Sequence, residues 1–237
     1  MTWCALLLTG VLAGCSEQPE ASNAAQEGAQ NSAATEQMQA SFVEGKHYRV
    51  VDPQGVSDGP LVTEFFSLYC GACYNMESRF LPMIVPALEA QGVTFEQKHV
   101  NFSGDQTGED VVRGFAILEQ IGQGEQKAAL KERLFEILGG KHHNHGAPDD
   151  DHGNDIQNLA DLRALFVEAG FEGEAFDQAA KSESVTAAVK AWSVEQQQYQ
   201  VQSVPSFIVN NRYQINMSSI ETLPQLVDLM VYLSNKE

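Results

Sequence analysis

Hydrophobic residues follow two different periodicities along this chain of 237 residues. Alternating or continuous apolar runs of strand length lie within residues 42–102 and return over residues 206–215, while residues 105–200 carry apolar side chains at three- and four-residue spacing. The first pattern is typical of β-strands and the second of helices that pack on one face. The strands expected are an edge strand ending at Asp52-Pro53, a central strand over Leu61–Tyr69, a third over Val93–Phe102, and a hairpin that turns at Asn210-Asn211.

Helices account for most of the other residues. A helix is expected from the residues after Cys70 to about Gln91, and Pro82 should kink or split it because proline cannot donate the helical hydrogen bond. A last helix is expected to start at the capping box Ser218-Ser-Ile-Glu221 and to run to about Asn235. The helices expected between them are Glu109–Ile121, Glu125–Leu138, Leu159–Ala169, Glu174–Lys181 and Ser184–Val201.

The order of these elements predicts the fold class. A strand, a long helix and a strand form a βαβ unit, whose strands are parallel and whose crossover is right-handed. Strand, strand, helix, strand, helical block, hairpin and helix together predict an α/β protein, a thioredoxin fold with an inserted helical subdomain. The thioredoxin-like domain is expected to comprise residues 41–105 and 201–237, and the helical insertion residues 106–200.

The first 40 residues are expected to hold a targeting signal and a linker. Residues 1–15 contain an apolar stretch too short to span a bilayer, and it ends in Leu12-Ala-Gly-Cys15, which resembles a bacterial lipoprotein signal with Cys15 as the lipidated residue. The segment departs from that pattern because Met1-Thr-Trp contains no Lys or Arg, and ordinary cleavage to a soluble periplasmic protein is the alternative. Residues 16–40 are rich in Ser, Ala, Gln and Glu and lack aromatic side chains, which predicts a disordered linker.

Composition narrows the classes of partner. The chain has 14 Lys and Arg residues against 32 Asp and Glu residues, a net charge of −18. Such a surface repels the phosphates of nucleic acids and of anionic membranes, so neither is an expected partner. Contact with a membrane is expected only through a lipid anchor, and the protein is expected to be a monomer.

The candidate chemistry lies at Cys70-Gly-Ala-Cys73, directly after the central strand and at the start of a helix. Two cysteines three positions apart on a helix lie on one face and can approach disulfide distance. The first also lies at the helix N-terminus, where unpaired N–H groups favour an anion and lower the pKa of a thiol. This pattern favours thiol–disulfide exchange, with half of a zinc site or two inert buried cysteines as alternatives.

Several further motifs resemble the DsbA family of bacterial periplasmic thiol–disulfide oxidoreductases. The resemblance covers about residues 42–237 and is specific because its motifs occur in the family's order. These motifs are Glu44-Gly-Lys46, Glu64-Phe-Phe-Ser67, Cys70-x-x-Cys73-Tyr74, His99-Val-Asn-Phe102, Ala169-Gly170, Val204-Pro205 and Asn210-x-x-Tyr-Gln-Ile-Asn216.

The resemblance implies a role for each matching residue. Cys70 would be the exposed attacking thiolate and Cys73 the shielded resolving thiol of a redox-active disulfide. Glu64 would be a buried acid that moves protons near the resolving thiol, with a solvent-facing strand residue as the alternative. Val204 and Pro205 would form a cis-proline loop that binds an extended substrate, with a plain strand-start proline as the alternative.

The resemblance also implies a cellular setting. The protein would oxidise reduced exported proteins in the periplasm, a DsbB-like membrane quinone reductase would reoxidise it, and no cofactor is expected. One departure bears on the direction of exchange, because Gly71-Ala72 stands where the family usually has Pro-His. Since Ala72 has no side-chain donor for a thiolate, we expect Cys70 to be less acidic and the protein less oxidising than is typical of the family. A reductase or isomerase of the same fold is the alternative.

A second cluster of titratable residues lies between two of the expected helices of the insertion. His142, His143, His145 and His152, with neighbouring aspartates, could bind Zn²⁺, Cu²⁺ or Ni²⁺, although a polar loop with solvated histidines is the favoured interpretation. Two further functional hypotheses follow: a tethered metal-binding protein that uses this loop, and a substrate-holding module with little turnover.

Overall fold

The computed structural model describes residues 42–139 and 156–236 of the chain. The predicted signal with Cys15, the predicted linker and the segment with His142, His143, His145 and His152 lie outside the described residues and stay predictions. Among the described residues, no group of three or more His, Cys, Asp or Glu side chains is placed to hold a metal ion.

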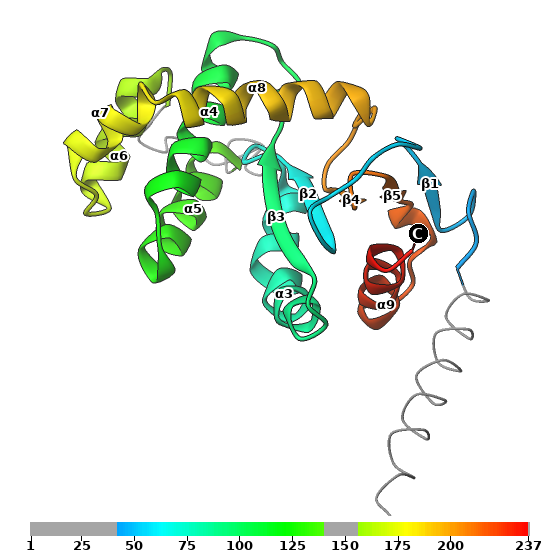
Figure 1. Ribbon diagram of the computed structural model, residues 1–237. Coiled ribbons are helices and arrows are strands. Elements are labelled where there is room, and N and C mark those ends of the chain that lie inside the picture. Colours follow the sequence, from blue (N-terminus) through cyan, green and yellow to red (C-terminus); the bar gives the residue numbers. More distant parts are fainter. Residues whose placement is uncertain (1–41, 140–155, 237) are drawn as a thin grey trace, which may run out of the picture. The chain divides into compact units, whose positions relative to one another are not determined.

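A five-stranded sheet forms the centre of the thioredoxin-like part (Figure 1). The strands occur in the order β1-β5-β4-β2-β3, where β2 and β3 are parallel and the other neighbours are antiparallel. Their bounds are Tyr48–Val50 for β1, Leu61–Phe66 for β2, Thr94–His99 for β3, Ser206–Val209 for β4 and Tyr213–Ile215 for β5. The predicted edge position of the first strand, the position of the second inside the sheet and the parallel βαβ unit are confirmed.

The predicted hairpin turn lies between β4 and β5. Asn210 and Asn211 have φ values of 51° and 57°, a left-handed conformation that asparagine tolerates better than most residues. The Asn210 side chain also accepts a hydrogen bond from the Leu61 amide at 3.0 Å and donates one to the Ser234 carbonyl at 2.8 Å. One turn residue therefore fixes the hairpin to β2 and to the C-terminal helix.

The helix that begins after Cys70 is split into three segments. The α-helix α2 covers Gly71–Asn75, the π-helical turn η2 covers Met76–Phe80, and α3 covers Leu81–Glu89. The split predicted at Pro82 is confirmed, since this proline lies in the first turn of α3, where its missing N–H would have no helical partner. The π-helical turn was not predicted, and it carries Glu77, whose partly exposed side chain pairs with Lys131.

The middle of the chain is helical, as predicted. Its helices are α4 Gln106–Ile121, α5 Gly124–Gly139, α6 Leu159–Glu168, α7 Gly173–Ala180 and α8 Glu183–Gln198. Helix α4 contacts α6, α7 and α8. The apolar faces of these helices form a hydrophobic core that also contains Phe66, Leu68 and Cys73. No helix in the two described ranges is long and apolar enough to cross a bilayer.

A second hydrophobic core joins the sheet to α3 and to the last helix, α9, which covers Leu223–Ser234. The predicted start of this helix at Ser218-Ser-Ile-Glu221 is wrong. Residues Met217–Ser219 form a short 3₁₀ turn, and α9 begins after Thr222, whose side chain accepts a hydrogen bond from the Gln225 amide. A threonine N-cap followed two residues later by Pro224 is the stronger start signal, because proline suits the first turn of a helix.

Candidate active site

Cys70 lies where the chain leaves the sheet and enters α2. The preceding residues Phe65, Phe66 and Leu68 are buried, so the end of the β2 segment is anchored in the interior. Cys70 is the N-cap of α2, and its Sγ accepts a hydrogen bond from the Cys73 amide at 3.1 Å. The sulfur is thereby held against the free N–H groups of the first helical turn, which favour a negative charge there.

The two cysteines, both free thiols, differ in their access to solvent. Cys70 is half-buried, whereas Cys73 is 1% exposed and lies in the core formed with the inserted helices. The predicted contrast between an accessible first thiol and a shielded second thiol is confirmed in this geometry. An attacking sulfur from another protein can therefore reach Cys70 more readily than Cys73.

The pKa values of the two thiols shift in opposite directions. A hydrogen bond from the Cys73 side chain, helped by the Cys73 and Ala72 amides, lowers the pKa of Cys70 from its usual value near 9 to about 6, although partial burial opposes this. The same hydrogen bond raises the pKa of Cys73, and burial raises it further. Near neutral pH the reduced pair therefore holds a thiolate at Cys70 and a thiol at Cys73.

The cis-proline loop brings a distant segment to the first thiol. The Val204–Pro205 peptide bond is cis, as the resemblance implied, and the Val204 carbonyl oxygen lies 3.5 Å from Cys70 Sγ. The plain strand-start interpretation is therefore wrong. The backbone of Val204 faces the sulfur at which exchange would occur.

Glu64 is a buried acid beneath the cysteine pair. Its side chain points into the interior from β2 with 1% of its surface exposed, so the solvent-facing alternative is wrong. Gln97, its partner in the β2–β3 register, donates a hydrogen bond from Nε2 to Glu64 Oε2 at 2.7 Å. Burial is the largest cause that raises the pKa of Glu64 to about 8, and the negative charges of Glu77 and Cys70 add to it. The hydrogen bond from Gln97 and the charge of Lys131 act in the other direction.

A lysine of the inserted helices completes this polar cluster. Lys131 lies on α5, and its Nζ is 2.7 Å from Glu77 Oε2 and donates a hydrogen bond to Gln97 Oε1. The ammonium also lies 5.6 Å from the centre of the Phe66 ring. Glu64, Gln97, Lys131 and Glu77 thus form one hydrogen-bonded network that joins β2, β3, α5 and η2. The network gives the buried carboxyl group polar neighbours in an otherwise apolar interior.

The sequence reasoning missed Gln97, Lys131 and Glu77. Gln97 could have been found by aligning the two parallel strands, since the register places it opposite Glu64. Lys131 left only a weak signal, because it lies on the buried side of a helix next to Leu130. Glu77 could not be found from the sequence, because hydrophobic periodicity does not predict the π-helical turn that positions it.

His99 has a structural role. It is 2% exposed, and its Nε2 accepts a hydrogen bond from the Leu68 amide at 2.9 Å. Burial lowers the pKa of His99 to about 3, so the ring stays neutral in the folded protein. Its contact with Leu68 supports the segment that carries Cys70.

Comparison with known proteins agrees with this geometry. A family model described as thioredoxin matches residues 53–229. The DsbA thiol:disulfide interchange protein of Escherichia coli K12 is 29% identical over 205 residues, covering 84% of this chain and 91% of that protein. DsbA of Haemophilus influenzae is 32% identical over 179 residues, covering 75% of this chain and 78% of that protein.

Solved structures show the same fold. DsbA of Klebsiella pneumoniae superposes with a TM-score of 0.65 at 24% identity, covering 82% of this chain and 98% of that one. DsbA of Proteus mirabilis, in a complex with a non-covalently bound peptide, gives 0.64 at 22% identity, covering 82% and 99%. With a Cys-x-x-Cys at the start of the helix after β2 and a cis-proline beside it, the chain belongs to the DsbA family of disulfide-forming thiol–disulfide oxidoreductases in the thioredoxin superfamily.

Proposed function

We propose that Cys70 and Cys73 donate their disulfide to reduced proteins that have been exported to the periplasm. The observation that carries this proposal is the contrast between the two thiols. Cys70 is accessible, lies 3.5 Å from the Val204 carbonyl and has a pKa near 6, while Cys73 is buried with a raised pKa. Such a pair directs every exchange to Cys70 and leaves Cys73 to close the disulfide.

Oxidation of a substrate takes two exchanges. A substrate thiolate attacks Cys70 Sγ, a mixed disulfide forms, and the Cys70–Cys73 bond breaks with its electron pair on Cys73. A second substrate thiolate then attacks the substrate sulfur of the mixed disulfide, and Cys70 leaves as a thiolate. The substrate gains a disulfide and loses two electrons and two protons, and the protein takes up the two electrons as the reduced pair.

Glu64 supplies a proton in the first exchange. Cys73 leaves as an anion in a buried place where its thiol form is strongly favoured, so it needs a proton at once. Glu64 is protonated at neutral pH because its pKa is about 8, and once ionised its negative charge raises the pKa of Cys73. A neutral buried acid is a suitable donor here, and it returns to its protonated form through the polar network.

The stability of the Cys70 thiolate favours the oxidant direction. A stabilised thiolate lowers the free energy of the reduced protein, which makes its disulfide a better oxidant. Ala72 contributes only a backbone amide to that stabilisation, where a histidine side chain would add a donor. We therefore propose a disulfide donor that is weaker than one with Pro-His between its cysteines.

The reoxidation partner, the membrane anchor and the domain bounds are further parts of the proposal. We propose that a DsbB-like membrane quinone reductase reoxidises the pair, and that Cys15 anchors the domain to a bacterial membrane through the linker of residues 16–40. The thioredoxin-like domain then comprises residues 41–105 and 201–237, with residues 106–200 inserted. We also propose that the protein acts as a monomer.

A single-turnover experiment tests this function. Oxidised protein is mixed with a peptide that carries two reduced cysteines, and the products are separated after acid quenching. We expect one peptide disulfide for each Cys70–Cys73 disulfide consumed. Unchanged peptide in this mixture, together with rapid reduction of a disulfide peptide by the reduced protein, would assign the chain to the reductase direction instead.

A further inference from the structure

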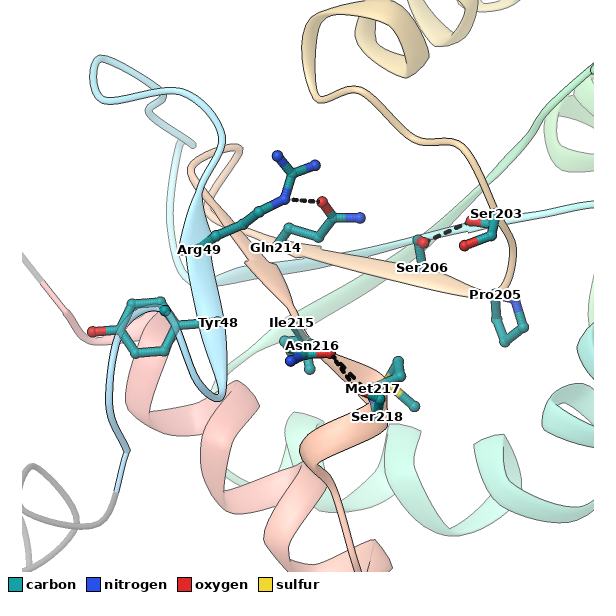
Figure 2. A pocket seen from close by; sticks show the side chains of 11 residues that line it. Tyr48, Arg49, Ser203, Pro205, Ser206, Gln214, Ile215, Asn216, Met217 and Ser218 are labelled. Carbon is teal, nitrogen blue, oxygen red and sulfur yellow. Dashed lines mark hydrogen bonds between the residues drawn. The ribbon is translucent and has the colours of Figure 1, made fainter.

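A polar hollow lies beside the cis-proline loop. It has a volume of about 400 Å³ and is lined by residues of β1, β5 and the segment around Pro205. Figure 2 shows its origin: β4 and β5 diverge at this end, with Ser206 and Pro205 on one side and Ile215 to Ser218 on the other. The paired residues of these two strands are Ile208 with Gln214 and Val209 with Tyr213.

The hollow is next to the position that a bound substrate would occupy. Ser203 and Pro205 line it, and they flank Val204, whose carbonyl oxygen lies 3.5 Å from Cys70 Sγ. An extended peptide advances about 3.3 Å per residue. A peptide whose cysteine reaches Cys70, and which runs past Val204 on this side, therefore brings a side chain over the hollow within about three residues.

Arg49 is the charged residue of the hollow. The other ten lining residues are neutral, and most present a hydroxyl, amide or backbone group. Arg49 projects from β1, where Nε donates a hydrogen bond to Gln214 Oε1 at 2.8 Å and Nη2 donates one to the Tyr199 carbonyl at 3.2 Å. These two bonds orient the guanidinium, and Figure 2 shows the one between its Nε and the Gln214 side chain.

The guanidinium has no acidic partner within the described part of the chain. No carboxylate of residues 42–139 or 156–236 lies within 4.0 Å of Arg49, although the protein carries a net charge of −18. Its Nη1 group is likewise without a hydrogen-bond partner among these residues. A planar guanidinium fixed on one side and free on the other matches the geometry of a carboxylate.

We propose that this hollow is a specificity site for an aspartate or glutamate side chain of the substrate, within about three residues of the cysteine that Cys70 attacks. The inference rests on the proposed function, because it assigns the substrate of the same site. Arg49 binds the carboxylate, and the serine and asparagine side chains around the hollow provide further polar contacts. Repulsion by the acidic surface does not cancel this preference, because physiological salt screens exposed charges beyond about 8 Å.

Matched peptides test the inference. Each reduced peptide has two cysteines and carries Asp, Asn or Lys at one varied position. The set places this varied residue in turn at each of the three positions before and after the first cysteine. The readout is the second-order rate constant for peptide oxidation by the oxidised protein. At one or two positions we expect the Asp peptide to react about fivefold faster than the Asn peptide and the Lys peptide to be slowest, which is the scale of a partly exposed charged hydrogen bond.

Two variants assign the preference to Arg49. In Arg49→Met the ratio of the Asp to the Asn rate constant is expected to fall to about one, and in Arg49→Glu the Lys peptide is expected to become the fastest. Lys190→Met is the control, since it removes the same charge from an exposed position on α8 and should keep the wild-type ratio. A preference for Asp that persists in Arg49→Met, or equal rates for all peptides with the wild-type protein, would overturn the inference.

A binding measurement separates this inference from the proposed function. Cys70→Ser protein is titrated with peptides in which serine replaces cysteine, so that affinity is measured without exchange. If no peptide is oxidised but Asp peptides still bind about fivefold more tightly than Asn peptides, the proposed function fails and the carboxylate site stands. If all peptides are oxidised at equal rates and bind equally, the function stands and the carboxylate site is refuted.

Discussion

Cys70 and Cys73 are separated by one turn of the same helix, yet they occupy two different regions of the molecule. Cys70 faces the cis-proline loop at the surface, where helical N–H groups and the neighbouring thiol stabilise its anion. Cys73 lies 1% exposed in the core of the inserted helices, where its pKa is raised. The same functional group is thus an acid in one region and a very weak acid in the other, chiefly because of hydrogen bonding and burial.

The comparison also explains why the insertion matters for the chemistry. The helical block supplies the apolar walls around Cys73, and it supplies Lys131, which reaches the network of Glu64. The thioredoxin-like sheet supplies Cys70, the cis-proline loop and Glu64 itself. The thioredoxin-like part keeps Cys70 accessible, and the inserted helices provide the apolar environment around Cys73.

The largest expected effect comes from removing the accessible sulfur. Cys70→Ser should lower the rate of dithiol-peptide oxidation by at least about a thousandfold, because Cys73, the other cysteine of the described residues, is buried. The Cys73→Ser protein should still form a mixed disulfide at Cys70 but cannot resolve it. The mixed disulfide should therefore accumulate and be detectable by mass spectrometry of the intact protein. A mixed disulfide formed at Cys73 in the Cys70→Ser protein would contradict the assigned roles.

Replacing the buried acid should have the next largest effect. Glu64→Gln keeps the size of the side chain but removes its titratable proton. Substrate oxidation near pH 7 should therefore slow by about tenfold to a hundredfold. The inflection near pH 8 in the rate profile should also disappear, since the pKa of Glu64 is about 8. Glu96→Gln is the matched control on β3, because its carboxylate is partly exposed and pairs with Lys98.

The same substitution should change how stability depends on pH. The pKa of Glu64 is higher in the folded protein, about 8, than in the unfolded chain, about 4.5, so the folded state keeps a proton that the unfolded state releases between these values. Stability therefore falls as the pH rises from about 4.5 to about 8. Urea unfolding of the reduced proteins should show that Glu64→Gln avoids a loss of about 5 kcal/mol across this window. Parallel pH profiles for the two proteins would show that Glu64 is not held protonated.

A smaller change is expected from restoring a donor between the cysteines. Ala72→His should lower the pKa of Cys70 below about 6 and shift the equilibrium with glutathione about tenfold towards the reduced protein. Ala128→His, at an exposed position of α5, is the control for the added histidine. If wild-type protein and Ala72→His gave the same equilibrium constant, the residue before Cys73 would not set the oxidising strength.

The smallest effect should come from the lysine of the insertion. Lys131 lowers the pKa of Glu64, so Lys131→Met should move the inflection near pH 8 upward by about one unit. Lys127→Met removes a charge one turn earlier on α5, where the lysine pairs with Glu119, and should leave the inflection in place. An unchanged inflection in both variants would show that Lys131 does not influence the titration of Glu64.

Local patterns in the sequence predicted most of the fold. The apolar run before Cys70, the Asn210-Asn211 turn and the helical spacing of residues 105–200 each specify structure through near neighbours, and the structure agrees with them. The start of α9 was misplaced because two competing N-caps lie four residues apart, and only the second is followed by a proline. The π-helical turn could not be predicted, because it depends on packing rather than on periodicity.

The chemistry was less fully predictable than the fold. Cys70, Cys73, Glu64 and Pro205 could be named because they occur in motifs that resemble a known family. Lys131 and Arg49 occur in no motif, and their positions depend on how α5 and β1 pack against distant segments. Side chains that act across elements need the tertiary structure to bring them together.

The measurement that tests the central claim most directly is the pH dependence of alkylation of the reduced protein, with Cys70 and Cys73 followed separately by peptide mass. The account predicts that Cys70 reacts with a midpoint near pH 6, while Cys73 stays almost unreactive in the folded protein up to pH 9. A midpoint for Cys70 near 8.5, the value of a free thiol in a peptide, would contradict the account.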